Sequence, residues 1–189
     1  MFKAMGTWGL PWVLVLTGCG SFEQEQYDIT LDEAQAQAVP YACTDKTVED
    51  PEPVPGTGGP SGLTLQQRWT VRAERFGATS LEVPDFAFTL PGGDLATIDD
   101  DGGPDVLDGT TSESGPFQYI DIRTRPLEDE AGTSVNYVVR FYIANDSLED
   151  DTIDGFIDVR RTTYTGAGAD AVDQEECTSK VRFTGRRVK

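Results

Sequence analysis

The side chains of this sequence best suited to site chemistry are the aspartates of an acidic, glycine-containing stretch. Residues 97–108 read TIDDDGGPDVLD, and calcium binds several carboxylate and carbonyl oxygens on a flexible loop. The candidate ligands are Asp99, Asp101, Asp105 and Asp108. Their spacing follows an EF-hand loop, but Thr97 stands where Asp is expected and no helical pattern flanks the loop. The simpler interpretation is a solvated acidic turn, and a looser calcium loop is the alternative.

The composition excludes several classes of enzyme. The chain has 33 acidic residues and no histidine. Ser-His-Asp and Cys-His nucleophilic sites, histidine-ligated zinc and proton transfer by histidine are therefore excluded. Carboxylate chemistry stays open, but no spacing singles out a catalytic pair among so many acids. An enzyme that depends on carboxylates is thus an alternative to a non-catalytic protein.

The net charge of −18 predicts that nucleic acid is not a partner, because that binding depends on neutralising phosphates. A cluster of bases nevertheless closes the chain. Its members are Lys180, Arg182, Arg186, Arg187 and Lys189. These bases would contact an anionic partner such as a cell-wall polymer. The simpler interpretation is pairing across strands with Asp154 and Asp158.

Several aromatic residues fall within segments whose patterns indicate strands. Those that could be partly exposed on a sheet face are Tyr119, Tyr137, Tyr142 and Phe156. A groove lined by such rings would bind a sugar or a peptide. Aromatic residues are also common on ordinary sheet faces, so the pattern by itself leaves both interpretations open.

The amino terminus has the pattern of a secretory signal. Lys3 gives it a short positive start, and residues 4–18 contain no charge. About 15 apolar or small residues are too few for a transmembrane helix, which needs roughly 20. A short apolar stretch after a positive residue is typical of a signal peptide.

The end of this stretch, Leu16-Thr17-Gly18-Cys19, resembles the lipobox of bacterial lipoproteins. The resemblance implies that residues 1–18 are removed and that Cys19 carries the lipid. The residues after Cys19 include no early aspartate, which in that family implies an outer-membrane destination. The resemblance covers about 20 residues and concerns processing, not fold. The alternative is an ordinary secretory signal with a chance match.

The number of cysteines agrees with this interpretation. The chain has three, Cys19, Cys43 and Cys177, and lipidation of Cys19 would leave an even pair. An exported protein meets an oxidising compartment, so we expect a disulfide between Cys43 and Cys177 that ties the first strand to the last. Two separate buried thiols are the alternative.

Alternation of apolar and polar residues predicts the fold. It is clearest over 63–74, 134–143 and 176–188, with loops rich in glycine, proline and aspartate between such segments. The pattern indicates an all-β antiparallel sandwich or barrel of about seven or eight strands. Residues 39–189 would form this single domain.

Residues 19–38 are polar and are expected to be a lipidated tether. Thr30 and Glu33 have the spacing of a capping box, which predicts a short helix within it. As a flexible chain, 19 such residues would reach roughly 25 Å.

Together these features predict a non-catalytic, lipid-anchored protein of the cell envelope. Its partner would be another protein, a glycan or a small ligand, and no cofactor is expected apart from the calcium considered above. A calcium-stabilised module of the adhesion type and a carboxylate-dependent enzyme of the periplasm or cell surface are the two alternatives.

Overall fold

The computed structural model describes residues 24–73, 79–99, 101–109, 115–126, 132–143, 151–166 and 170–189. Within them lie twelve strands and one short helix. They are β1 (Gln24–Leu31), α1 (Glu33–Gln37), β2 (Pro40–Asp45), β3 (Val54–Thr57), β4 (Gln66–Ala73), β5 (Thr79–Val83), β6 (Ala87–Thr89), β7 (Leu95–Thr97), β8 (Asp105–Gly109), β9 (Gly115–Pro126), β10 (Thr133–Ile143), β11 (Thr152–Thr165) and β12 (Val172–Arg187). Their pairings are antiparallel, which confirms the predicted all-β class.

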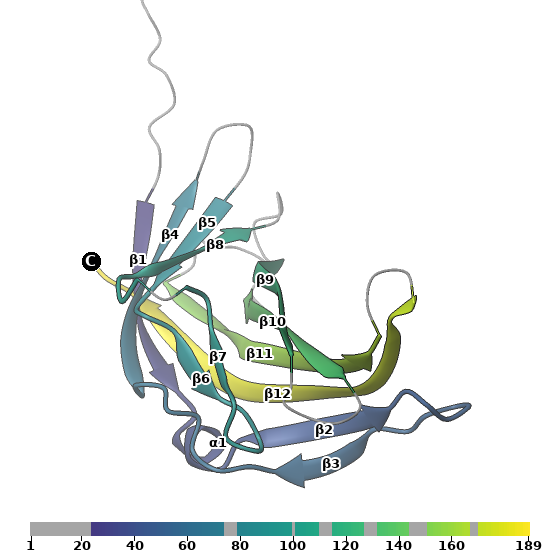
Figure 1. Cartoon of the computed structure of the whole chain (residues 1–189). Coiled ribbons are helices and arrows are strands. Elements are labelled where there is room, and N and C mark those ends of the chain that lie inside the picture. The colour runs from purple at the N-terminus through teal and green to yellow at the C-terminus, as the bar shows by residue number, and fades with distance from the viewer. Residues whose placement is uncertain are drawn as a thin grey trace, which may run out of the picture.

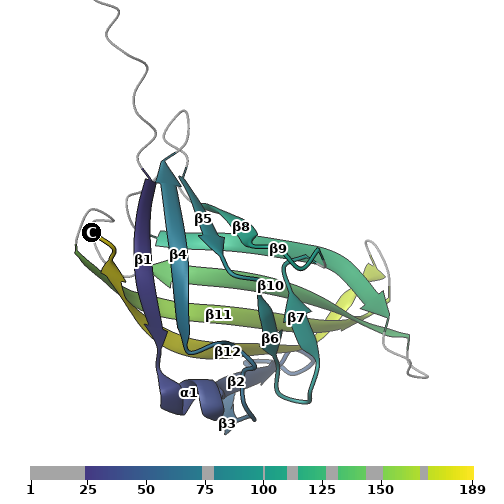
Figure 2. The same ribbon diagram turned by 90° about the vertical axis from the view of Figure 1, so that its left-hand side faces the viewer.

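Ten of these strands form one sheet that folds back on itself. Their order is β1-β4-β5-β8-β9-β10-β11-β12-β2-β3, and β1 also pairs with β12. One layer holds β1, β4, β5 and β8, and the other holds β9 to β12 (Figure 1). Figure 2 shows the first layer in front of the second, with α1 at one end. The fold is therefore sandwich-like, where the sequence had left sandwich and barrel open.

The core lies between the layers and centres on Trp69 of β4. The Trp69 ring packs edge-on against Phe141 of β10, with ring centroids 5.0 Å apart, and against Phe183 of β12 at 4.7 Å. Such contacts add about 0.5–1.5 kcal/mol each to the gain from burial. Because these three residues point inward, their sequence neighbours on each strand must point outward. The core thus determines which side chains β10 to β12 present to solvent.

Short strands form between residue 79 and residue 109. Residues 79–90 hold two of them, β5 and β6, because Pro84 interrupts the ladder and the inward positions shift after it. β7 and β8 follow. These are three and five residues long, too short for alternation to be recognised in the sequence.

Residues 24–38 belong to the folded domain and not to a tether, which corrects the predicted boundary at residue 39. β1 pairs with β4 on one side and with β12 on the other, and Tyr27 and Ile29 are 0% and 1% exposed. The predicted short helix is present as α1. Its N-cap is Asp32, which accepts a hydrogen bond from the Gln35 N–H at 3.0 Å, whereas Thr30 remains in β1.

Candidate functional site

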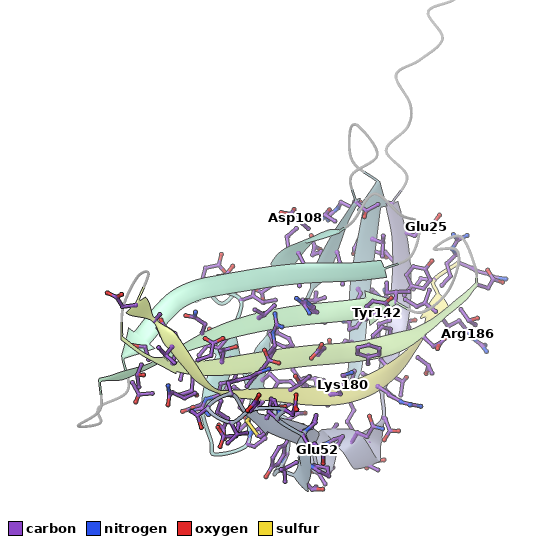
Figure 3. All side chains as sticks on the ribbon, turned by 90° about the vertical axis from the view of Figure 1, so that its right-hand side faces the viewer. Glu25, Glu52, Asp108, Tyr142, Lys180 and Arg186 are labelled. Carbon is purple, nitrogen blue, oxygen red and sulfur yellow. A yellow bond between two sulfur atoms is a disulfide. The ribbon has the colours of Figure 1, made fainter. Side chains whose placement is uncertain are left out.

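The outer face of β10, β11 and β12 carries a row of neighbouring side chains. Tyr142, Phe156 and Arg182 occupy directly opposed positions in the two ladders, and each is next to an inward-facing core residue on its strand. Lys180 lies one outward position away from Arg182, and Figure 3 shows Tyr142 and Lys180 on the same face. We call the surface formed by Tyr142, Phe156, Lys180 and Arg182 the outer groove.

Two rings of the outer groove are stacked. The centroids of Tyr142 and Phe156 are 5.1 Å apart with 10° between the ring planes, and Tyr142 is 40% exposed. The Lys180 ammonium lies 4.7 Å from the centre of the Phe156 ring, a cation–π contact. Phe156 thus lies between the Tyr142 ring and the Lys180 ammonium, and the stack combines an apolar aromatic surface with a positive charge.

The backbone beside the stack requires glycine at position 155. A Cβ placed on Gly155 would overlap the carbonyl oxygen of Tyr142 and would meet the Phe183 ring at 2.9 Å. Any larger residue would push β10 and β11 apart at this point. Gly155 thus allows the close approach of the two strands next to Phe156.

Two open hollows flank Phe156 and Arg182. Both residues line each hollow. The first, of about 510 Å³, extends to Thr30–Asp32 between β1 and α1. The second, of about 560 Å³, extends to Pro40–Ala42 of β2 and to Gln35 of α1. The Gln35 side-chain oxygen accepts a hydrogen bond from the Arg182 backbone N–H at 2.9 Å, which holds α1 against β12. The outer groove therefore has open space on both sides of Phe156.

A charged row lies beside the stacked rings. Arg140, Asp158 and Lys180 are opposed across β10, β11 and β12. Burial raises the pKa of the Asp158 carboxyl, while the positive charges of Lys180, Arg140 and Arg160 oppose that rise. Of the two cross-strand pairings expected between acids and bases, the one at Asp158 is present, because Lys180 lies opposite it. Asp154 instead has Thr184 opposite it.

The Arg182 side chain is exposed and forms no ion pair within the part of the chain that the structure describes. Its backbone is fixed, because its carbonyl oxygen also accepts a hydrogen bond from the Asp32 N–H at 2.8 Å. Arginines that do have carboxylate partners are Arg68, Arg72, Arg160, Arg161 and Arg187. Arg182 therefore presents an exposed guanidinium from a backbone position that is held by two hydrogen bonds to the α1 region.

Of the four aromatic residues predicted on sheet faces, the structure brings Tyr142 and Phe156 together. Tyr137 is only 3% exposed, because its position on β10 alternates inward with Val139. The side chain of Tyr119 lies outside the described residues. The sequence could not pair the first two rings, since their contact depends on the register of β10 against β11.

The predicted calcium ligands do not gather around one point in the described loop. Asp99 and Asp101 each accept a hydrogen bond from the N–H two residues further on, at 3.0 and 2.7 Å, which is typical of a self-stabilised turn. Asp105 is buried, whereas Asp108 points out from the other face of β8. Among the described residues, no three carboxylates of this loop bring their oxygens as close together as one metal ion requires.

Asp105 is a buried carboxyl with acidic neighbours. It accepts a hydrogen bond from the Phe86 N–H at 2.6 Å and is 1% exposed, so it is closed to a substrate. Burial, together with the charges of Asp99 and Asp85, raises the pKa of Asp105 to about 6, although the Phe86 N–H acts in the other direction. The folded state therefore binds this proton more tightly than the unfolded state. The stability that it contributes is complete below about pH 4 and is lost as the pH rises through about 6.

Asp105→Asn is expected to stabilise the protein at pH 7.5 and to have little effect at pH 4. Asparagine keeps an acceptor for the Phe86 N–H without burying a charge. We expect a gain of about 1–3 kcal/mol at pH 7.5, because the wild-type protein must ionise this buried carboxyl to remain folded there. Denaturant unfolding at the two pH values checks this. The exposed Asp108→Asn is the control, and an equal effect of Asp105→Asn at both pH values would contradict the account.

Cys43 of β2 and Cys177 of β12 form the predicted disulfide, and they stand directly opposite each other in the ladder. The bond joins the last strand to β2, and not to the first strand as expected. Together with Glu175 these cysteines are the one group among the described residues whose atoms could share a metal ion, but both sulfurs are in the disulfide. Cys19, the predicted site of lipid attachment, lies outside the described residues.

A scan against protein-family models finds no matching family, and a search of curated proteins finds no significant match. The described residues contain no helix that is long and apolar enough to cross a membrane. The one helix among them, α1, spans five residues.

Proposed function

We propose that this chain is a non-catalytic lipoprotein of the bacterial envelope whose outer groove binds an acidic polysaccharide. Two features support the anchor. Leu16–Cys19 resembles a lipobox, and the disulfide uses Cys43 and Cys177, which leaves Cys19 as the third cysteine. A disulfide is also favoured in the oxidising compartments to which lipoproteins are exported.

The observation that carries the binding proposal is the stack of Tyr142 on Phe156 with Lys180 and Arg182 beside it. The apolar face of a sugar ring packs well on such a flat aromatic surface. Sugar carboxylates bind guanidinium and ammonium groups through charge-assisted hydrogen bonds. Both kinds of contact are offered within one row of side chains, so a single acidic sugar unit could use them together.

Charge complementarity favours an acidic ligand over a neutral one. The chain as a whole carries −18 and repels polyanions over most of its surface. The outer face of β10 to β12 differs, because the bases Arg140, Arg160, Lys180 and Arg182 outnumber the acids there, which are Asp154, Asp158 and Glu176. An acidic polymer would therefore be directed to this face, and the hollows on both sides of Phe156 leave room for its chain.

The carboxylates near the stack favour binding over hydrolysis. Asp158 lies between Arg140 and Lys180, and Asp32 is engaged as the N-cap of α1 through the Gln35 N–H. A third carboxylate, Asp154, lines the first hollow. A glycosidase places two carboxyl groups on either side of the scissile bond, free to exchange a proton and to attack. Because Asp158 and Asp32 are held in structural contacts, these three carboxylates do not supply such a pair.

Phe156→Ala and Arg182→Ala are each expected to weaken binding of an oligogalacturonate by about tenfold, equivalent to about 1.4 kcal/mol. The first removes the stacking surface and the second removes the free guanidinium. Isothermal titration of the full chain in detergent micelles measures the affinity. A neutral oligosaccharide of equal length should bind more weakly than the acidic one.

The matched control is Arg68→Ala, which removes an exposed arginine on β4 that is paired with Asp28 at 2.7 Å. It should leave the affinity for oligogalacturonate unchanged. The proposal fails if the wild-type chain does not bind this probe, or if Arg68→Ala weakens binding as much as Arg182→Ala.

A further inference from the structure

The place where β1 begins restricts how a lipid-anchored domain can stand on a membrane. β1 is hydrogen-bonded along both edges, to β4 and to β12, and its Tyr27 and Ile29 are buried in the core. A strand that is hydrogen-bonded and buried in this way cannot serve as a flexible linker. The only residues left for a linker after Cys19 are 20–23.

Such a linker is short. From Cys19 to Gln24 there are five residue steps, which span at most about 18 Å when fully extended. With lipid on Cys19 at the bilayer surface, the start of β1 must stay within that distance of the lipid headgroups. The roughly 25 Å reach expected for a 19-residue tether is therefore not available.

The carboxyl terminus lies at this same end of the domain. The Val188 N–H donates a hydrogen bond to the Gln26 carbonyl oxygen at 2.8 Å, and Arg187 stands opposite Tyr27. Ion pairs also occur here, between Arg187 and Glu25 at 3.1 Å and between Lys189 and Asp151 at 3.3 Å. Bases thus accompany acids at this end of an otherwise acidic protein, which reduces repulsion from anionic lipid.

The outer groove begins at the other end of β1. Its first hollow is lined by Thr30–Asp32, and the seven steps from Gln24 to Leu31 cover about 23 Å along the strand. In Figure 3, Glu25 lies toward the top of the domain and Lys180, at the groove, lies lower. β1 therefore separates the linker from the first hollow of the outer groove by about 23 Å.

We infer that the end of the domain formed by the start of β1 and the carboxyl terminus lies against the lipid surface, so that the outer groove is held away from the membrane by the length of β1. This inference rests on the lipid anchor of the proposed function. It assigns a partner, the bilayer, to a particular end of the domain. It also places the polysaccharide beyond the headgroup layer.

Energy transfer from the protein to the membrane tests this orientation. The full lipidated chain is placed in vesicles of phosphatidylethanolamine and phosphatidylglycerol that contain an acceptor-labelled lipid. A donor is attached through a genetically encoded reactive residue at position 189 or, in a second sample, at position 52. Both Lys189 and Glu52 are exposed, so neither label disturbs the core. A matched variant carries an insertion of about 20 Gly and Ser residues after Ser21, which lengthens the linker.

Transfer should be at least about twofold stronger from position 189 than from position 52, and the insertion should remove most of that difference. Equal transfer from both positions in a chain that floats with the vesicles would overturn the orientation and leave the anchor intact. Failure of the chain to float would overturn both. Flotation of the same samples thus tests the lipid anchor, whereas the difference in energy transfer tests the orientation.

Discussion

Cys19→Ser is expected to move the protein from the membrane fraction to the soluble fraction and to abolish its labelling by palmitate. Cys19 is the residue that a lipobox would modify, and serine has no thiol to receive diacylglycerol. Each buried methylene of an acyl chain contributes about 0.8 kcal/mol, so stable anchoring needs two or more chains. No membrane-spanning helix is present among the described residues to replace them. The expected change is therefore nearly complete.

Gly20→Ala is a matched control for the anchor, because it alters the residue next to Cys19 and keeps the thiol. It should fractionate with the membrane as the wild type does. Radiolabelled palmitate followed by membrane flotation gives both readouts. The anchor would be wrong if Cys19→Ser incorporated as much label as the wild type.

Removal of the disulfide should cause the largest loss of stability. The Cys43–Cys177 bond closes a loop of sequence separation 134. The chain-entropy model gives at most about 5 kcal/mol for a loop of that length. For a domain of this size such a loss lowers Tm by about 10–20 °C. We expect this shift in Cys43→Ala/Cys177→Ala, measured by thermal unfolding under non-reducing conditions.

Reductant provides the internal control for this prediction. Wild-type protein treated with dithiothreitol should melt close to the double variant, and the double variant should not respond to dithiothreitol. If Tm were unchanged by both the substitutions and the reductant, the bond between β2 and β12 would contribute nothing to stability.

The fold class could be predicted because alternation is a local signal, and the disulfide because only three cysteines had to be assigned. The strand that presents Tyr142 alternates over its whole length, and the cysteines could be paired by counting. β1 also alternates, with Tyr27 and Ile29 inward, but its polar outer residues resembled a linker. Its position between β4 and β12 depends on tertiary pairing, which no local pattern reveals.

The outer groove was predicted only in parts. The basic carboxyl-terminal segment and the aromatic residues were each recognised as candidate contacts for a partner. Their meeting at Phe156 depends on the registers of β11 against β10 and against β12. The hollows beside the stack depend on α1 and β2, which come from a distant part of the chain. Such arrangements follow from the folded topology and not from residue spacing.

Mapping the bound polysaccharide onto the protein tests the central claim most directly. In a titration of the full chain in micelles with oligogalacturonate, backbone amide NMR signals report which residues sense the ligand. We predict that the shifts concentrate at Tyr142, Phe156, Lys180 and Arg182, and that β4 around Arg68 is unaffected. Shifts centred on another face, or no shifts at saturating concentrations of the probe, would contradict the assignment of the outer groove as a site for acidic polysaccharide.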